Sequence, residues 1–470
     1  MIMAELWKAR LKELRFYKSA MLGTGILIFL IAVSVYTIIT IPYGEAVELW
    51  KAGEGFWIDN PRNAQPSWVN LFSSKKLPET IILDTRKGGA GIGKVIIPIR
   101  GGMSRINIEV SFDYQYDDFP SEVNLFLTAK YNRTSPHISV YWVKPNGQKM
   151  KLKELGVKET SAYYISIDHE LSKRLQSYLE DKVGGELEYE VTPEIALFAV
   201  EDESALKLET VKPMKGRYKL LIEGLSFERD CDVNIKLVVY GKVYGVAGTD
   251  HLRRDLRIAI LWGAPIALAF GVTASVSVAL LQIIIAAVSA WYGRSVDFLL
   301  QKATEVSMIL PFLPILLMIS VFYKFSIWVL LVIVVALSAF GSGVKTYRAM
   351  FLQVKELPYI EAAKAYGAGD LRIVFRYMIP KVLPTIIPSL VLSVSGFVFL
   401  EAALAMLGLG DPLAPTWGKI IEDAYDKGAL YKGYYYWILE PSIFLVVTAL
   451  GFALLGFALD KIFNPRLREM

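Results

Sequence analysis

The chain has 470 residues, of which 54% are hydrophobic and 21% are charged. This combination does not suit a single soluble domain, and it indicates one part embedded in lipid and another exposed to water. The high apolar content excludes a disordered chain, the single cysteine excludes a disulfide scaffold, and three histidines argue against a histidine-based metal centre. A net charge of +5 is too small to indicate nucleic-acid binding.

Six long apolar runs predict transmembrane helices, because about 20 apolar residues cross the hydrocarbon core of a membrane. The predicted spans are 19–42, 258–291, 304–323, 325–345, 382–406 and 437–460. Residues 1–18 are basic and amphipathic, and they predict either a cytoplasmic helix on the membrane surface or the solvated start of the first span. Pro311 and Pro314 predict a kink in the third span.

The distribution of Lys and Arg predicts the orientation of the spans. These residues gather before the first span, in the segment 345–381 and after the last span. Six spans place all three segments on one side of the membrane, which the positive-inside rule makes the cytoplasm. We therefore expect a multi-pass protein of the plasma membrane with both termini in the cytoplasm and with residues 43–257 outside the cell.

The region 43–257 contains short runs rich in Val, Ile, Tyr and Phe that turn-forming residues separate. They predict strands at 80–83, 95–99, 106–112, 123–129, 138–143, 218–222 and 233–240. Only 170–182 has a helical pattern. We therefore expect an inserted, extracellular β-sandwich-like domain at about 79–245.

One glycine-rich stretch in this region, 88–94, nearly matches a phosphate-binding loop and ends at Lys94. The next residue, Val95, has no hydroxyl group for Mg²⁺, and a strand rather than a helix follows. We interpret the stretch as a hairpin turn, so that any ATPase must be another chain. No cofactor, no metal site and no catalytic residue is predicted.

The segment 355–380, between the fourth and fifth spans, predicts a helix, a turn and a second helix. Pro358 and Glu361 suit the start of the first helix, and Gly367 ends it. The second helix is expected to stop at Pro380.

The second helix can be capped by Asp370. Its expected apolar face consists of Leu371, Val374, Phe375 and Met378. A pair of short helices with a smooth, alanine-rich surface suits docking into another protein. The alternative is an ordinary basic loop between two spans.

This segment resembles the Glu-Ala-Ala loop of ABC importer permeases, and most closely that of the C-type permease of dipeptide and oligopeptide importers. Further motifs of that family have counterparts in the same order, namely Pro66-Ser67-Trp68, Gly248-Thr249-Asp250, Leu407-Gly408-Leu409-Gly410, Pro415-Thr416-Trp417-Gly418 and Asn464-Pro465-Arg466. A glycine of the family is Arg253 here, which leaves the conformation of that turn open. The family lacks the large insertion, so the chain near Leu77 and near Tyr244 is expected to lie within roughly 15 Å.

The resemblance implies an all-α polytopic membrane protein, a type I ABC importer permease with six transmembrane helices, that carries the inserted β domain. It implies a second, homologous permease subunit, two cytoplasmic ABC ATPase subunits, an extracellular substrate-binding protein and membrane lipid as partners, and no nucleic acid. The ATPase-coupling residues that it implies are Tyr359, Glu361, Ala362, Ala363, Lys364, Gly367 and Ala368. Apart from the resemblance, Glu401 in the fifth span is a candidate for an outer gate or the substrate path, or else for a structural hydrogen bond.

The function that this resemblance implies is the import of dipeptides or oligopeptides by alternating access, with ATP hydrolysis on partner subunits. Import of oligosaccharides is the alternative within the same class. A membrane sensor would need a cytoplasmic output domain, and the sequence has only residues 1–18 before the first predicted span and residues 461–470 after the last. An anchored hydrolase would need a nucleophile motif near His137 or His169, and the sequence has none there.

Overall fold

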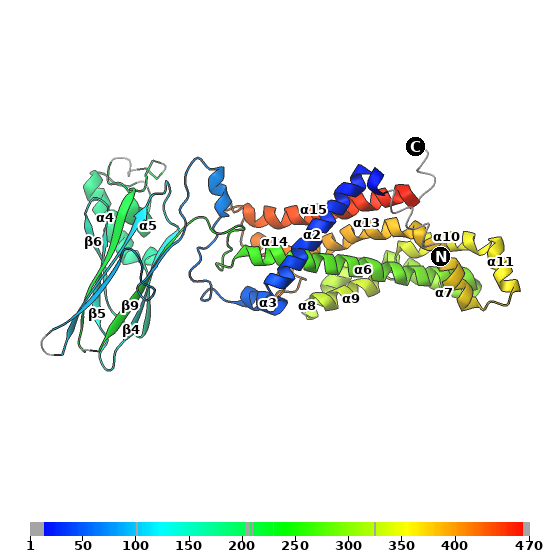
Figure 1. Ribbon diagram of the computed structural model, residues 1–470, viewed down its shortest axis with the longest axis horizontal. Coiled ribbons are helices and arrows are strands. Elements are labelled where there is room, and N and C mark those ends of the chain that lie inside the picture. The colour runs from blue at the N-terminus through cyan, green and yellow to red at the C-terminus, as the bar shows by residue number, and fades with distance from the viewer. Residues whose placement is uncertain are drawn as a thin grey trace. The chain divides into compact units, whose positions relative to one another are not determined.

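The computed structural model describes residues 14–99, 102–187, 189–202, 207–208, 210–228, 230–323 and 326–463. The chain forms two compact units, one helical and one rich in strands (Figure 1). The helical unit comprises Met1–Lys51 and Leu256–Met470, and the strand-rich unit is Ala52–Asp255. Most of the predicted N-terminal helix at 1–18 and the family motif at Asn464 lie outside the described residues.

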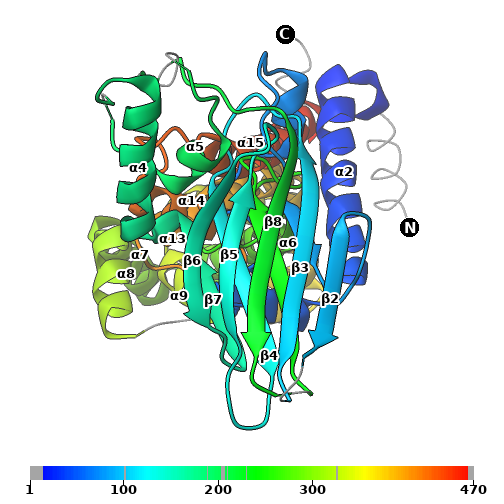
Figure 2. The ribbon, with the colours of Figure 1, turned by 90° about the vertical axis from the view of Figure 1, so that its left-hand side faces the viewer.

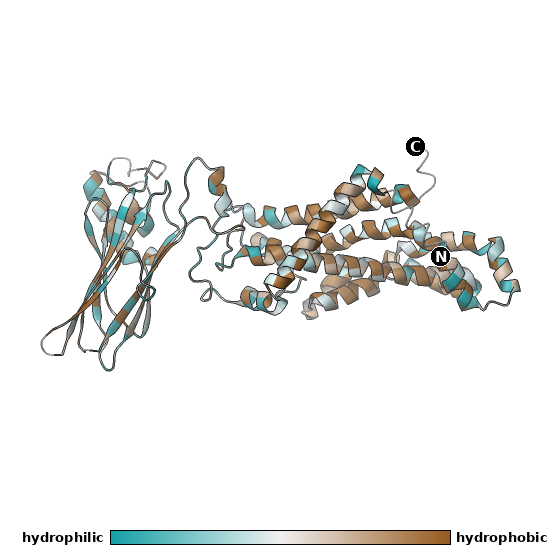
Figure 3. Cartoon of the chain, in the orientation of Figure 1, coloured by the Kyte–Doolittle hydropathy of each residue, from teal (hydrophilic) through white to brown (hydrophobic). Residues whose placement is uncertain are grey.

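Apolar helices make up the helical unit, and Figure 3 shows hydrophobic residues along almost every long helix. In chain order they are α2 Lys18–Thr40, α3 Tyr43–Lys51, α6 Leu256–Tyr292, α7 Arg294–Ile309, α8 Phe312–Phe322, α9 Ile327–Ser338, α10 Ser342–Lys355, α11 Pro358–Ala365, α12 Asp370–Ile373, α13 Ile379–Met406, α14 Trp417–Asp426 and α15 Tyr436–Phe463. Four segments are long and apolar enough to cross a membrane: Lys18–Thr40, Leu256–Tyr292, Asp370–Met406 and Tyr436–Phe463. Among the described residues, two bent pairs, α7 with α8 and α9 with α10, raise the number to as many as 6.

The two bent pairs occupy the segments that were predicted as spans at 304–323 and 325–345, so neither span is a single helix. α7 and α8 meet at 76°, because Pro311 cannot continue a helix and favours an extended conformation at Leu310 before it. α9 and α10 meet at 50°, and the residue before α10, Gly341, is extended. The kink predicted from Pro311 is therefore a complete break.

Pro380 does not stop the second loop helix, contrary to the sequence prediction. α12, a π-helical turn at Val374–Met378 and α13 follow one another in the continuous segment Asp370–Met406. A proline lacks an N–H group, and its ring displaces the carbonyl four residues earlier. The wider π turn accommodates both effects, because the amide of Ile379 donates to the carbonyl of Val374, five residues back.

Glycines allow the long helices to approach one another closely. A Cβ atom on Gly23 of α2 would lie 2.8 Å from the carbonyl oxygen of Gly451 in α15. A Cβ atom on Gly456 of α15 would lie 2.6 Å from Leu392 in α13. Small residues at helix crossings are typical of membrane bundles, where packing rather than a hydrophobic driving force holds helices together.

Two antiparallel sheets form the strand-rich unit, which is β-rich as predicted. The strands are β1 Ile81–Asp84, β2 Ile92–Pro98, β3 Ser104–Tyr114, β4 Glu122–Lys130, β5 His137–Val143, β6 Lys149–Gly156, β7 Thr160–Tyr164, β8 Gly216–Ser226 and β9 Asp232–Tyr240. One sheet has the order β1-β9-β4-β7, and the other has the order β2-β3-β8-β5-β6, which Figure 2 shows face-on. The core contains an aromatic cluster of Phe112, Tyr114, Trp142, Phe198 and Tyr218. Two helices, α4 His169–Val183 and α5 Pro193–Phe198, complete the unit.

The strands β6 and β7 were not predicted from the sequence. In β6 the exposed Lys149, Lys151 and Lys153 alternate with the buried Met150 and Leu152. Both strands lie at a sheet edge, where charged side chains discourage pairing with another chain. Strands of this kind lack the continuous apolar run by which the central strands were recognised.

The chain enters and leaves the strand-rich domain at neighbouring points, as an inserted domain requires. The amide of Lys242 donates to the carbonyl of Pro78 at 2.8 Å. Nearby, the indole of Trp68 donates to the carbonyl of Val246 at 3.0 Å. The Pro-Ser-Trp and Gly-Thr-Asp motifs therefore lie side by side, although a whole domain separates them in the sequence.

The glycine-rich stretch 88–94 is a turn that leads into β2, but it is not the hairpin turn that the sequence predicted, because β1 pairs with β9 in one sheet and β2 pairs with β3 in the other. Three of its glycines have positive φ angles, and its last residues already belong to β2. Lys94 donates to Asp232 at 2.5 Å and to Asn234 at 2.8 Å, both on β9. The lysine thus holds two strands together instead of facing a phosphate.

Arg253, for which the resemblance predicts a glycine, adopts a φ angle of 65°. This left-handed conformation costs a residue with a side chain of the order of 1 kcal/mol. The guanidinium offsets the cost by donating to Glu54 at 2.9 Å, to the carbonyl of Asn60 at 2.7 Å and to Glu122 at 2.5 Å. It also lies 4.3 Å from the ring centroid of Tyr240. Arg253 therefore ties the turn at 250–254 to strands β4 and β9.

Replacing Arg253 with glycine should destabilise the strand-rich domain. The substitution relieves the backbone strain but removes the hydrogen bonds of Arg253 to Glu54, to Glu122 and to the carbonyl of Asn60, which we expect to cost about 1–3 kcal/mol. Thermal unfolding of the purified full-length chain in detergent, followed by circular dichroism, measures the effect. Arg253→Lys keeps the positive charge but loses the planar guanidinium. Its unfolding temperature should therefore fall between those of the wild type and of Arg253→Gly. An Arg253→Gly protein at least as stable as the wild type would contradict this account.

The same network predicts a pH dependence. Burial by itself would raise the pKa of Glu54, but hydrogen bonds from Arg253 and Arg62 outweigh it and hold the pKa below its ordinary value. The resulting stabilisation is fully present above the ordinary glutamate pKa of about 4.3, and it is lost as the pH falls through the lower pKa of the folded state. The acid side of the stability profile should therefore be shallower in Arg253→Gly than in the wild type.

Candidate functional site

The predicted coupling segment, residues 355–380, contains α11, a tight turn and α12. Gly367 ends α11 with a φ angle of 78°, a conformation that favours glycine. The amide of Ala368 donates to the carbonyl of Ala363 at 3.0 Å, which satisfies the end of the helix. Asp370 begins α12 without making the side-chain cap that the sequence predicted.

The coupling segment buries one face and exposes the other. The buried residues are Ile360, Ala363, Ile373, Val374 and Met378. Of the residues assigned to ATPase coupling, the exposed ones are Tyr359, Glu361, Ala362, Lys364 and Gly367, and Ala368 is half-buried. Ala363 therefore packs against the core of its own chain, which is a different role from the one expected.

The apolar face predicted for the second helix is divided in the structure. Val374 and Met378 are buried, whereas Leu371 is 61% exposed and Phe375 is 50% exposed. Tyr366, in the turn before α12, is 92% exposed. The carboxylate of Glu361 has no ion-pair or hydrogen-bond partner among the described residues. The exposed face thus combines apolar side chains with an unpaired charge, as interfaces with another protein do.

Two lysines fasten the coupling segment to the end of α6, and these contacts were not predicted from the sequence. Lys355 Nζ donates to the carbonyls of Ala290 and Trp291, at 3.0 and 2.9 Å. These carbonyls belong to the last turn of α6, where a cation complements the helix dipole. Lys364 Nζ lies 4.7 Å from the ring centroid of Trp291. One buried tryptophan thereby serves as the platform for α10 and α11.

A cavity of about 410 Å³ lies within the helical unit. Its polar lining side chains are Ser275, Gln282, Ser307, Ser338, Ser342, Ser389 and Ser393, together with Tyr347. None of the described lining residues is charged. The cavity therefore offers hydroxyl and amide groups to a ligand but no fixed charge.

Both broken helix pairs border this cavity. Phe312 follows the break between α7 and α8, and Ser338, Gly341 and Ser342 flank the break between α9 and α10. The side-chain amide of Gln282 in α6 donates to the carbonyl of Ser338 at 2.8 Å. Carbonyls released by a broken helix are tolerated at membrane depth only where they face protein or a polar cavity.

Glu401 does not line the cavity. It is buried in α13 and shares a hydrogen bond with Thr416, the residue that caps α14. The next residue, Trp417, donates its indole N–H to the carbonyl of Ile260 at 2.8 Å and lies against Gly263 of α6. Glu401 thus helps to hold α14, a helix that the sequence did not predict.

Comparisons with known proteins agree with this description. The profile of the family described as binding-protein-dependent transport system inner membrane component matches residues 279–469. A putative peptide transport system permease protein of Brucella suis is 34% identical over 224 residues, which is 47% of this chain and 73% of the relative. The dipeptide transport system permease protein DppC of Bacillus subtilis is 29% identical over 47% of this chain and 69% of its own length. The oligopeptide transport system permease protein OppC of the same organism is 28% identical over 47% and 72%.

The helical unit with its apolar, partly broken helices is a membrane permease domain, accompanied by a separate β-rich domain. The chain belongs to the family of binding-protein-dependent transport system inner membrane components, as the resemblance to ABC peptide permeases predicted. It is therefore a multi-pass membrane protein, and the ATPase of such a system is a separate subunit. The matched region of the family profile lies wholly within the helical unit.

Replacing Gly263 with alanine should destabilise the helical unit. The new Cβ atom would lie 2.1 Å from the indole ring of Trp417, which is buried and cannot move without displacing α14. Overpacking of this kind costs about 1–3 kcal/mol. Thermal unfolding followed by tryptophan fluorescence measures it. The control is Gly396→Ala in α13, where a Cβ atom meets nothing within 4 Å. Equal behaviour of the two variants would show that the contact is unimportant.

Proposed function

We propose that the chain is the permease subunit of an ATP-driven importer that moves dipeptides or oligopeptides into the cell by alternating access. The names of its relatives, which refer to peptide, dipeptide and oligopeptide transport, support peptides as the substrate. The observation that carries the proposal is the coupling segment. It exposes a docking face and is at the same time continuous with α13, a helix that lines the cavity.

Cytoplasmic ATPase subunits dock on the exposed face of the coupling segment. Tyr366, Leu371 and Phe375 supply apolar contact area, and Glu361 pairs with a basic side chain of the ATPase. The segment between Asp370 and Ser389 is one helix, about 28 Å long at 1.5 Å per residue. A displacement of the docking face therefore moves the lining of the cavity directly.

The same arrangement gives the proposed topology. In this topology both termini and the coupling segment lie in the cytoplasm and the strand-rich domain lies outside. The four long helices and two bent pairs, up to 6 spans among the described residues, support it. A second permease subunit completes the substrate path, and an extracellular binding protein delivers the substrate. Glu401 lies toward the other end of the helix that starts at the coupling segment, where it stabilises α14 at the outer side.

The cavity lining fits a substrate that is recognised by hydrogen bonds rather than by charge. Serine hydroxyls and one glutamine amide can bind the main-chain amide groups of a peptide, whatever its side chains are. Sugar hydroxyls would find the same partners, so oligosaccharide import is the second candidate. The names of the relatives decide in favour of peptides.

Substitutions in the coupling segment should uncouple transport without unfolding the permease. Glu361→Lys reverses an unpaired charge, and Gly367→Val forces a branched side chain into a positive φ angle. We expect at least a tenfold loss of ATP-dependent dipeptide uptake in proteoliposomes that contain the complete transporter. Gly25→Val, at a site where a Cβ atom meets nothing within 4 Å, and Lys94→Ala should transport normally. Normal uptake in both coupling variants would remove the segment from the mechanism.

The proposed topology is tested by labelling single cysteines in intact cells. In a Cys231→Ser background, Lys149→Cys on the exposed edge strand β6 should react with a membrane-impermeant thiol reagent added outside. Tyr366→Cys, whose parent side chain is 92% exposed, should react only after the membrane is opened. The reverse labelling pattern would overturn the orientation.

A further inference from the structure

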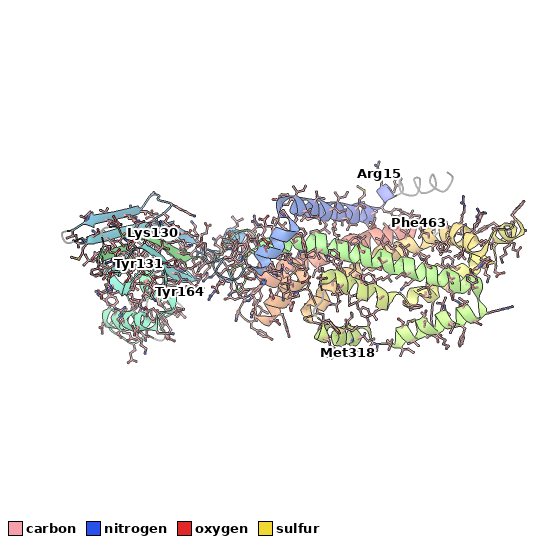
Figure 4. The ribbon with its side chains drawn as sticks, turned by 90° about the horizontal axis from the view of Figure 1, so that it is seen from below. Arg15, Lys130, Tyr131, Tyr164, Met318 and Phe463 are labelled. Carbon is pink, nitrogen blue, oxygen red and sulfur yellow. The ribbon has the colours of Figure 1, made fainter. Side chains whose placement is uncertain are left out.

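A second pocket, of about 530 Å³, lies in the strand-rich domain. Its walls come from the start of β4, the end of β7, helix α5 and the chain that leads into the domain. The residues that decide its chemistry are Arg62, Glu122, Asn124, Tyr164, Glu194 and Arg253. Tyr164 is labelled in Figure 4, and its ring is 44% exposed. The volume suits a small organic molecule, since a single water molecule needs far less space.

One wall of the pocket carries an acceptor that nothing in the described structure satisfies. Asn124 is only 2% exposed, and its Nδ2 donates to Glu122 at 3.4 Å. Its Oδ1 is buried and has no hydrogen-bond donor among the described residues. A buried polar atom without a partner costs about 1–3 kcal/mol, so such atoms are normally satisfied by a ligand or a water molecule. The missing partner of Asn124 is an N–H or O–H donor.

The pocket is lined by more carboxylates than cationic side chains. The guanidinium of Arg253 already donates to Glu54, to Glu122 and to the carbonyl of Asn60. Arg62 also pairs with Glu54. Glu194 remains as a third, buried carboxylate that has hydrogen bonds from Ser166, Thr192 and its own backbone but no cationic partner among those that its pKa reflects, and burial raises that pKa. A positively charged donor in the pocket would compensate this carboxylate and the acceptor of Asn124 together.

An organic cation fits the pocket better than a metal ion. The described residues contain no group of three or more His, Cys, Asp or Glu side chains that could hold a metal. The ring of Tyr164 and the exposed Ile167 offer an apolar wall beside the acceptors. At the rim, the side chain of Arg62 is 45% exposed and can pair with a carboxylate of a ligand.

We propose that this pocket of the strand-rich domain binds a small molecule through a primary ammonium group, held by Asn124 Oδ1 and the carboxylates of Glu122 and Glu194. The site lies outside the part of the chain that matches the family profile, and it does not depend on the proposed transport function. A free peptide amino terminus and a simple alkylamine share the ammonium chemistry, and only the first also brings a carboxylate for Arg62.

Isothermal titration calorimetry of the purified full-length chain, in detergent and without ATPase subunits, tests the proposal. The probes are L-alanyl-L-alanine, its N-acetyl derivative and ethylamine. Removal of the ammonium group by acetylation deletes the charge-assisted hydrogen bonds, so binding should weaken roughly tenfold or more. Binding of both amines supports an ammonium site, and stronger binding of the dipeptide shows that its carboxylate is also recognised. The proposal is overturned if neither amine binds, or if the N-acetyl derivative binds as tightly as L-alanyl-L-alanine itself.

Variants of the chain locate the binding site. Asn124→Ala and Glu194→Gln should each weaken dipeptide binding at least tenfold, and Glu194→Gln keeps the shape of the side chain. Glu223→Gln, on the exposed face of β8, is the matched control and should bind as the wild type does. Gln282→Ala changes the cavity of the helical unit and should also leave binding intact. Loss of binding in Gln282→Ala with normal binding in Glu194→Gln would assign the dipeptide to the other cavity and overturn the proposal.

Discussion

The helical unit depends on one constraint, which is that a backbone polar group at membrane depth needs a partner. Long helices satisfy it within themselves, yet this chain interrupts two of its apolar segments, at 76° and at 50°. Both interruptions border the cavity that serines and Gln282 line, and Gln282 bonds a carbonyl released by one of them. The breaks therefore lie beside polar side chains. The carbonyl of Ser338 accepts from Gln282 and also from the amide of Gly341 at 3.1 Å.

The coupling segment obeys the same constraint in a different way. A proline in a helix interior removes one hydrogen bond, and at Pro380 the chain widens into a π turn instead of ending the helix. The exposed Leu371 and Phe375 and the cavity-lining Ser389 and Ser393 consequently belong to one continuous segment, Asp370–Met406. In the proposed mechanism this helix carries the displacement of a docked ATPase to the cavity. Trp291, which contacts Lys355 and Lys364, links α6 to the same segment.

The sequence reveals those features that depend on local pattern. Uncharged runs indicated the apolar helices, and Val- and Ile-rich runs indicated the central strands, because burial on all sides leaves such a signature. Edge strand β6, in which three of eight residues are lysine, and the short amphipathic helix α14 have no such signature. The division of the coupling segment was also beyond prediction. Ala363 is buried in the core of its own chain, whereas the neighbouring Ala362 is exposed to solvent. Which of the two alanines is buried depends on how α11 packs onto the cluster that contains Trp291.

Arg253 shows how an inserted domain can exploit a backbone constraint that the parent fold already carries. The turn needs a positive φ angle at residue 253, and glycine adopts such an angle without strain. The resemblance to the family also predicts a glycine at this position. An insertion that enters and leaves at neighbouring points would otherwise be attached only through the two strands of its neck. A side chain at this one position can reach β4 and β9 of the insertion at once, and its three hydrogen bonds offset the local strain. Arg253 and the carboxylates that bind it also line the wall of the neighbouring pocket.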